Sequence, residues 1–199
     1  RIIEQLGQGG MATVYKAYHA SLDRYVALKV LHPAFNEDQT FTMRFQREAR
    51  VVAKLEHPCI VPIYDYSEHE KRPYLVMKYI EGDTLKARLN QGPLTSEEIE
   101  QVVNSVGAAL EYAHRQGILH RDIKPANILV NPYGRPMLAD FNISSQPEGS
   151  ESSGDEMFGG TFVYMAPEHL DAFNPGDPTG HEAVTARSDM YSLGIVLKQ

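Results

Sequence analysis

Short runs in which apolar residues alternate with polar ones open the chain and predict β-strands. The runs cover residues 2–6, 13–20, 25–30, 60–66 and 74–80, and they are rich in Val, Ile, Leu and Tyr. The charged stretch 67–72 between the last two runs predicts a turn. Residues 41–55 instead carry apolar side chains at helical spacing (Phe41, Phe45, Val52 and Leu55), which predicts one amphipathic helix. The first part of the chain is therefore expected to form five strands and one helix.

Helices are expected to dominate after the short connector 81–83. The pattern predicts a short helix over 85–90 and a long one over 95–116, in which Thr95 or Ser96 caps the first turn and Gly117 ends the helix. Short strands are expected at 128–130 and 136–139, and loops at the polar stretches 142–160 and 171–182. Residues 188–199 show an apolar helical pattern with no stop signal, which predicts that the chain is a fragment.

Composition and charge narrow the class of protein. The chain has 199 residues, of which 42% are hydrophobic and 23% charged, as in globular proteins. Its net charge of −7 argues against a general nucleic-acid binder. One cysteine, Cys59, excludes an intrachain disulfide and a cysteine zinc site, and no apolar run is long enough to span a membrane. A reducing, cytoplasmic setting is therefore expected.

A glycine-rich stretch lies between the first two predicted strands. It reads Gly7-Gln8-Gly9-Gly10-Met11-Ala12-Thr13-Val14. Glycines allow a backbone hairpin to approach phosphate oxygens and to present N–H donors to them, although such a hairpin is more often only a turn. A dinucleotide-binding fold would place a helix after this loop, whereas a strand is predicted here, so that fold is disfavoured.

A lysine in the third strand and a glutamate in the helix form the second candidate pair. Lys29 ends the apolar stretch Val26-Ala27-Leu28-Lys29, and a lysine in such a strand is usually an edge residue with its ammonium in water. Glu48 lies on the helix face that carries Phe45 and Val52, which is expected to pack on the sheet. Because an unpaired buried carboxylate is costly, a Lys29–Glu48 pair is the functional interpretation.

The most specific motif is His120-Arg121-Asp122-Ile123-Lys124-Pro125-Ala126-Asn127, which is followed by Asp140-Phe141. Asp122, Asn127 and Asp140 supply three oxygen groups at turns, and hard divalent cations such as Mg²⁺ prefer oxygen ligands. A match of this length and order is improbable by chance.

These motifs together resemble those of eukaryotic-like protein kinases, and most closely the bacterial serine/threonine kinases, over the whole chain. The resemblance implies an α+β, bilobal fold with a five-stranded antiparallel N-lobe that holds one helix, and a mainly helical, incomplete C-lobe. It implies boundaries at 1–77 for the N-lobe, 78–83 for the hinge and connector, and 84–199 for the partial C-lobe. Residues 140–168 correspond to the activation segment.

The resemblance also implies a role for each matching residue. Asp122 is expected to be the catalytic base, Lys124 to neutralise the transferred γ-phosphate, and Lys29, paired with Glu48, to contact the α- and β-phosphates. Asn127 and Asp140 are expected to bind Mg²⁺, with Mn²⁺ as an alternative, and Asp189 to anchor the catalytic loop. His120 and Phe141 match members of an apolar stack. ATP is expected to contact Leu6, Gly7, Gly9, Gly10, Val14, Ala27, Met77, Lys78, Tyr79, Ile80 and Leu129.

The expected reaction is transfer of the γ-phosphate of ATP to Ser or Thr hydroxyls of protein substrates by a non-specific serine/threonine kinase. Lys124, two residues after Asp122, follows the serine/threonine pattern. Arg121 matches the residue that reads a phosphate on the activation segment, and a homodimer that phosphorylates itself in trans is a further expectation. No nucleic-acid partner is expected.

Two departures from the family pattern support an alternative, a pseudokinase or nucleotide-binding scaffold of the same fold. Asn142 stands where the family has glycine after Asp-Phe, which predicts slower switching between active and inactive states. The family's later helices do not follow residue 199, so the fragment alone is expected to be inactive, and Glu168 is expected to lack its usual arginine partner.

Overall fold

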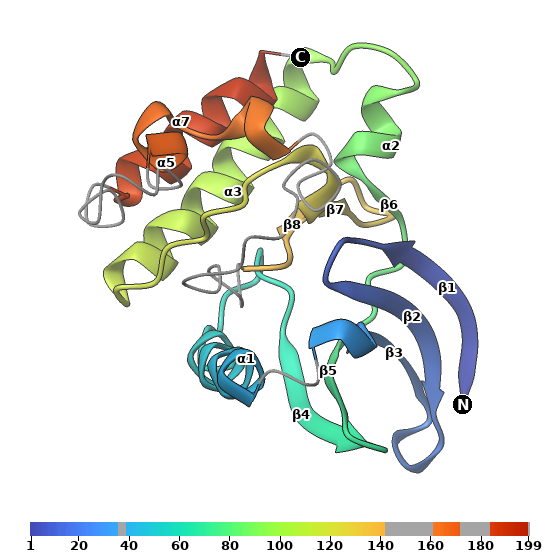
Figure 1. Cartoon of the computed structure of the whole chain (residues 1–199). Helices are drawn as coiled ribbons and strands as arrows, with labels where there is room; N and C mark the ends of the chain where they lie inside the picture. The colour runs from blue at the N-terminus through green and yellow to red at the C-terminus, as the bar shows by residue number, and fades with distance from the viewer. Residues whose placement is uncertain (36–38, 142–160, 172–183, 199) are drawn as a thin grey trace. The chain divides into compact units, whose positions relative to one another are not determined.

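The computed structural model describes residues 1–35, 39–141, 161–171 and 184–198, which form two compact units (Figure 1). The described part of the first unit comprises residues 1–56 and 61–80, apart from 36–38. The described part of the second unit comprises 57–60, 81–141, 161–171 and 184–198. No helix within these described ranges is long and apolar enough to cross a membrane.

The first unit contains a five-stranded antiparallel sheet, as the alternating runs predict. Its strands are β1 (Ile2–Gln8), β2 (Ala12–His19), β3 (Arg24–Leu31), β4 (Ile63–His69) and β5 (Arg72–Lys78), in the spatial order β1-β2-β3-β5-β4. Two short 3₁₀ turns, η1 (Ala20–Leu22) and η2 (Pro33–Phe35), flank β3. Every neighbouring pair in this sheet is antiparallel.

The turn between β4 and β5 is shorter than the stretch 67–72 that the charge pattern predicts. The strands continue through most of that stretch and pair Glu68 with Pro73 and His69 with Arg72. Glu70 and Lys71 alone form the turn, with φ values of 50° and 62°. Two consecutive residues with positive φ form the hairpin turn whose twist matches that of the flanking strands. Charged side chains on the outer face of the hairpin account for the polar pattern.

The helix of the first unit, α1 (Gln39–Val52), packs on the sheet through the predicted face. Phe41, Phe45, Ala49 and Val52 are buried, and the Phe45 ring lies 6.1 Å from that of Tyr66 on β4. The helix ends three residues before the predicted end, although Leu55 beyond it is also buried.

The second unit is mainly helical. Its helices are α2 (Leu85–Leu89), α3 (Ser96–Arg115), α5 (Pro167–Asp171) and α7 (Ala186–Leu197), and α3 and α7 lie side by side (Figure 1). A small sheet joins β6 (Asp83–Thr84), β7 (Ile128–Val130) and β8 (Pro136–Leu138) in that order. The 3₁₀ turns η3 (Pro125–Asn127) and η4 (Thr161–Tyr164) complete the described elements. The predicted loop at 142–160 lies outside the described residues. The predicted loop at 171–182 also lies outside them, except for residue 171.

Residues 57–60 connect α1 to β4 but pack with the second unit. The Leu138 amide donates to the Cys59 carbonyl at 2.8 Å, and the His57 ring stacks on Tyr112 of α3 at 5.4 Å. The described part of the first unit ends at Ile80.

Gly82 in the connector has no room for a side chain. Its φ is +129°, and a Cβ would overlap the carbonyl oxygen of Val130 on β7. Gly92 has the same φ, but a Cβ there meets no atom within 4 Å. We expect Gly82→Ala to lower the free energy of unfolding by about 2 kcal/mol more than Gly92→Ala in urea titrations, because only the first adds a backbone clash to the φ strain. Equal losses in the two variants would contradict this prediction.

The start of α3 carries an ion pair that links it to α2. Glu98 receives hydrogen bonds from Arg88 at 2.7 and 2.8 Å and from the Thr95 amide at 2.8 Å, and the Thr95 side chain caps the helix. The hydrogen bonds from Arg88, followed by that from the Thr95 backbone, lower the pKa of Glu98 to about 2.

This lowered pKa predicts a contribution to stability that depends on pH. The contribution is present above the ordinary carboxyl pKa of about 4.5 and is lost as the pH falls from there toward 2. We therefore expect the free energy of unfolding of Glu98→Gln to change less between pH 5 and pH 2.5 than that of the unmodified chain, with urea titrations as the measurement. Glu97→Gln, in the same helical turn, is the matched control and should keep the acid dependence.

Candidate active site

Four of the predicted ATP-contacting residues share one face of the five-stranded sheet. In the observed register Val14 on β2 lies opposite Lys29 on β3, and Ala27 on β3 lies opposite Met77 on β5. Residues that pair directly across strands point to the same side, as do residues two apart on one strand. The register therefore places all four side chains on a single face, which the sequence pattern alone did not determine.

The glycine-rich loop joins β1 to β2 at the edge of this sheet. The Gly9 amide donates to the Ala12 carbonyl at 2.9 Å and closes the hairpin. A Cβ added at Gly7 would meet no atom within 4 Å, and one at Gly9 would make only an ordinary contact. Packing within the protein therefore does not require glycine at these two positions. A ligand that approaches the backbone closely would require it.

Lys29 and Glu48 belong to the same unit, and both are half-buried. Glu48 immediately precedes the buried Ala49 on α1, and Lys29 lies on the face of β3 described above. Burial of both groups agrees with the predicted ion pair, which stays a prediction. Leu6, Gly10 and the predicted hinge residues Lys78 to Ile80 also lie in this unit. Leu129 lies on β7 of the second unit, opposite Met137.

The catalytic-loop motif forms a compact hydrogen-bonded group in the second unit. One carboxylate oxygen of Asp122, Oδ2, accepts hydrogen bonds from Lys124 Nζ and Asn127 Nδ2, both at 2.9 Å. The same Asn127 Nδ2 also donates to the Asp122 backbone carbonyl at 2.8 Å. The other carboxylate oxygen, Oδ1, is buried and has no hydrogen-bond partner among the described residues. Asp122, Lys124 and Asn127 thus lie in direct contact in the second unit, and the catalytic and metal-binding roles expected of them stay predictions.

These contacts also leave Asn127 suited to bind a cation. Because Nδ2 makes both hydrogen bonds to Asp122, the amide oxygen Oδ1 is the atom that remains for a metal. Within the described ranges no group of three or more His, Cys, Asp or Glu side chains gathers to hold an ion. A cation held by Asn127 and Asp140 alone would need further oxygen ligands from phosphate or water, which Mg²⁺ commonly takes.

Asp189, near the start of α7, is hydrogen-bonded to the backbone of the catalytic-loop motif. Its carboxylate is 2% exposed and accepts hydrogen bonds from the backbone amides of His120 at 2.8 Å and Arg121 at 2.7 Å. Burial alone would raise the pKa of Asp189, but the hydrogen bonds from the His114 side chain and from the backbone amides of His120 and Arg121 outweigh it, so the pKa lies below its usual value. The structure thus shows the anchor that the family resemblance implies.

His114 on α3 is a partner of Asp189 that no motif in the sequence indicates. Its Nε2 lies 2.7 Å from Asp189 Oδ2. The two residues are 75 positions apart in the chain, and they meet because α3 and α7 pack together. A histidine in the last turn of a helix is common for electrostatic reasons, so its position in the sequence carried no specific signal.

His120 is a neutral structural residue at the centre of this group. Its Nδ1 accepts the Asp122 amide at 3.2 Å and its Nε2 donates to the Ala139 carbonyl at 2.9 Å, which requires the neutral Nε2–H form. Complete burial lowers its pKa. Its ring contacts Phe141 with 4.6 Å between centroids, so two residues of the predicted apolar stack do touch.

Two motif residues adopt left-handed backbone conformations, Arg121 with φ 64° and Asp140 with φ 55°. Such conformations are uncommon for residues other than glycine and concentrate at functional sites. Asn142, whose replacement of glycine suggested slower switching, lies outside the described residues. The same holds for five serines that are candidate phosphorylation sites on the predicted activation segment: Ser144, Ser145, Ser150, Ser152 and Ser153.

Glu168 has a different partner from the arginine that the family pattern suggests. It accepts a hydrogen bond from Ser188 Oγ at 2.7 Å, and this bond, together with its own backbone amide, lowers the pKa of Glu168. Glu168 is therefore not left unpaired, because a serine at the start of α7 reaches it. Next to it, burial and the nearby Arg121 lower the pKa of His169.

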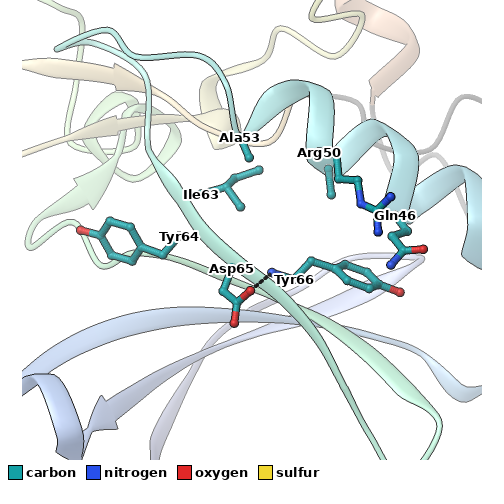
Figure 2. Close-up of a pocket in the computed structure, with 8 residues that line it drawn as sticks. Gln46, Arg50, Ala53, Ile63, Tyr64, Asp65 and Tyr66 are labelled. Carbon is teal, nitrogen blue, oxygen red and sulfur yellow. Dashed lines mark hydrogen bonds between the residues drawn. The ribbon is translucent and has the colours of Figure 1, made fainter.

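A separate pocket of about 270 Å³ opens between α1 and β4 in the first unit (Figure 2). Ala49, Ala53 and Ile63 form its apolar part, while Gln46, Arg50 and Tyr66 contribute polar groups. None of the residues predicted to contact ATP lines it.

The fold and the catalytic-loop geometry define the class of protein: the chain belongs to the protein kinase domain family, whose family model matches residues 1–199. The family's common activity is ATP-dependent transfer of phosphate to protein. This assignment confirms the family and the α+β kinase fold expected from the motifs.

Among individual proteins, the chain is similar to bacterial serine/threonine kinases. It is 40% identical over 200 residues to the probable serine/threonine-protein kinase PknB of Lactococcus lactis and 38% identical over 198 residues to PrkC of Bacillus subtilis. Each match covers 99% of this chain but only 30% and 29% of the relative. A crystal structure of the Mycobacterium tuberculosis PknI kinase domain superposes with a TM-score of 0.74 at 35% identity, covering 98% of this chain and 70% of that one.

Proposed function

We propose that the protein carrying this chain is an active serine/threonine protein kinase that transfers the γ-phosphate of ATP to hydroxyl groups of protein substrates. The chain spans about 30% of the length of the curated relatives it matches, and those relatives are named serine/threonine-protein kinases. The observation that supports the proposal is the different bonding of the two carboxylate oxygens of Asp122: Oδ2 contacts Lys124 and Asn127, whereas Oδ1 has no hydrogen-bond partner among the described residues.

The different bonding of the two oxygens determines which reaction step Asp122 would support. Lys124 and Asn127 both bind Oδ2, so they fix the carboxylate plane and leave Oδ1 to accept a hydrogen bond from a substrate hydroxyl. An acceptor in this position orients the hydroxyl oxygen for attack and receives its proton as the new P–O bond forms. The ammonium of Lys124, which lies 2.9 Å from Asp122 Oδ2, would balance negative charge on the transferred phosphoryl group.

The remaining predicted residues would hold the nucleotide. Bound Mg²⁺ or Mn²⁺ at Asn127 and Asp140 would neutralise phosphate charge. In the first unit, Gly7 and Gly9 leave the hairpin backbone accessible, and Lys29 with Glu48 would contact the phosphates. The adenine would lie against Val14, Ala27 and Met77 and bind the backbone of residues 78–80.

Regulation and location belong to the same proposal. Arg121 lies in the catalytic-loop motif, where it would pair with a phosphate on the activation segment, and a homodimer would supply that phosphate in trans.

The free, buried thiol of Cys59 is compatible with a reducing cytoplasmic location.

Phosphate transfer from labelled ATP tests the proposed activity. We expect the protein, incubated with Mg²⁺ and ATP, to label itself and a generic basic protein on Ser or Thr, and we expect Asp122→Asn to abolish most of the labelling. Stabilisation by ATP in a thermal melt without any transfer would instead establish the alternative, a nucleotide-binding pseudokinase, which the glycine replacement at Asn142 favours.

A further inference from the structure

Lys16 and Tyr25, to which the sequence motifs assign no role, form a cluster with the predicted hinge residue Tyr79 in the first unit. Lys16 on β2 places its ammonium over two rings, 4.9 Å from the centroid of Tyr25 and 4.6 Å from that of Tyr79. The two rings contact each other edge to face with 6.4 Å between centroids. A cation within about 6 Å of an aromatic centroid is attracted by the electrons of the ring face.

The register places this cluster beside the predicted adenine contacts. Lys16 lies directly opposite Ala27 on β3, and Ala27 lies opposite Met77 on β5, so all three side chains share one face. Pairing of β5 with β3 ends where Val26 meets Lys78. Tyr79 is therefore the first residue after β5, and its ring is the part of the hinge segment that Lys16 contacts.

A surface ion pair is the simpler interpretation of Lys16. Its Nζ lies 3.5 Å from Glu4 Oε1, but the Glu4 side chain is 56% exposed while that of Lys16 is only 21% exposed. Exposed ion pairs contribute little because water and salt screen them. The Lys16 ammonium also lies 4.6 Å from the Tyr79 ring centroid, and a hydrogen bond with the Tyr79 side chain, ahead of the contribution of Glu4, raises the pKa of Lys16.

We propose that Lys16 is a positioning residue for nucleotide binding: it holds the Tyr79 ring against the sheet and thereby fixes the backbone of residues 78–80 that reads the adenine. The proposal rests on the proposed kinase function, in which that backbone binds the base. A backbone fixed before binding loses less conformational freedom when the nucleotide arrives, which increases affinity. Lys16 itself touches neither the reacting phosphate nor the catalytic loop in this proposal.

The test compares Lys16→Met with the unmodified protein in steady-state kinetics with ATP and with GTP. We expect KM for ATP to rise about fivefold or more, the effect of losing a partly buried cation–π contact. The kcat should stay within about twofold, because the catalytic loop is unchanged. KM for GTP should rise less, because the hinge backbone is matched to adenine. Lys16→Arg, which keeps a cation over the rings, should restore KM for ATP.

Three controls separate this role from a general loss of stability. Glu4→Gln removes only the ion pair and Lys54→Met removes an exposed lysine of the same unit, and both should leave KM for ATP unchanged. Thermal melts should show similar stability for all variants. The proposal is overturned by an unchanged KM for ATP in Lys16→Met, by an equal rise in Glu4→Gln, or by failure of Lys16→Arg to restore it.

A failure of the proposed kinase function would be recognised separately. In that case the unmodified protein would transfer no phosphate at all. Calorimetric titration would still measure the dissociation constant for ATP of the unmodified protein and of Lys16→Met. Weaker ATP binding by Lys16→Met would then support the positioning role in a nucleotide-binding scaffold, and equal binding would overturn it.

Discussion

Replacement of Asp122 by Asn is expected to lower kcat by about 10²–10⁴-fold, the range for loss of a positioned general base. The structure explains why an isosteric amide cannot substitute. Lys124 and Asn127 both donate to Oδ2, so the introduced amide would turn its carbonyl oxygen toward them. Its NH₂ group would then occupy the Oδ1 position, where a substrate hydroxyl needs an acceptor.

Steady-state phosphate transfer to one protein substrate measures this effect, with thermal melting to show that the variant is folded. The KM for ATP should change little, because the predicted adenine contacts on the five-stranded sheet lie in the other structural unit. Asp65→Asn, which neutralises an exposed carboxylate on β4, is the matched control and should retain full activity. Retention of more than about a tenth of kcat by Asp122→Asn would contradict the role of Asp122 as base.

Replacement of Asp189 by Ala is expected to lower the free energy of unfolding by about 3–5 kcal/mol, the cost of removing one partner from a buried charged network. The backbone amides of His120 and Arg121 would lose their acceptor, and the His114 side chain would lose its partner. Asp189→Asn should lose less, because its remaining carbonyl oxygen still accepts from part of this group. Urea titrations at neutral pH measure both losses.

The pH dependence provides a second measurement on the same residue. The pKa of Asp189 is lowered in the folded chain, so its contribution is present above the ordinary carboxyl pKa of about 3.8 and is lost as the pH falls below it. The stability of the unmodified chain should therefore fall more steeply below pH 4 than that of Asp189→Asn. An equal fall in the free energy of unfolding below pH 4 for the two proteins would contradict an anchor that depends on the charge of Asp189.

The activity of Asp189→Asn should also fall, because Asp189 holds the loop that carries Asp122. A variant that is destabilised but fully active at low temperature would show that the anchor serves stability alone. His114→Ala, which removes one donor from the same carboxylate, should give a smaller loss in both measurements.

Local patterns predicted most elements of this fold, because strands and helices are set by side chains that are near in sequence. The alternating runs placed all five strands of the first unit, and the helical spacing of Phe41, Phe45 and Val52 placed the buried face of α1. The predicted turn at 67–72 was wrong, since charge pattern alone does not distinguish a long turn from exposed hairpin strands.

The catalytic loop was also predictable from sequence, because Asp122, Lys124 and Asn127 lie within six residues and contact one another locally. The sequence by itself therefore determined the family, the two classes of secondary structure and the candidate catalytic residues.

Contacts between distant segments were decided by the tertiary structure alone. His114 and Asp189 meet because α3 packs on α7, Ser188 reaches Glu168, and the strand register brings Lys16 over Tyr79. Such contacts depend on how elements pack and on which residues pair across strands. A one-residue change in register would move Lys16 to the opposite face of the sheet.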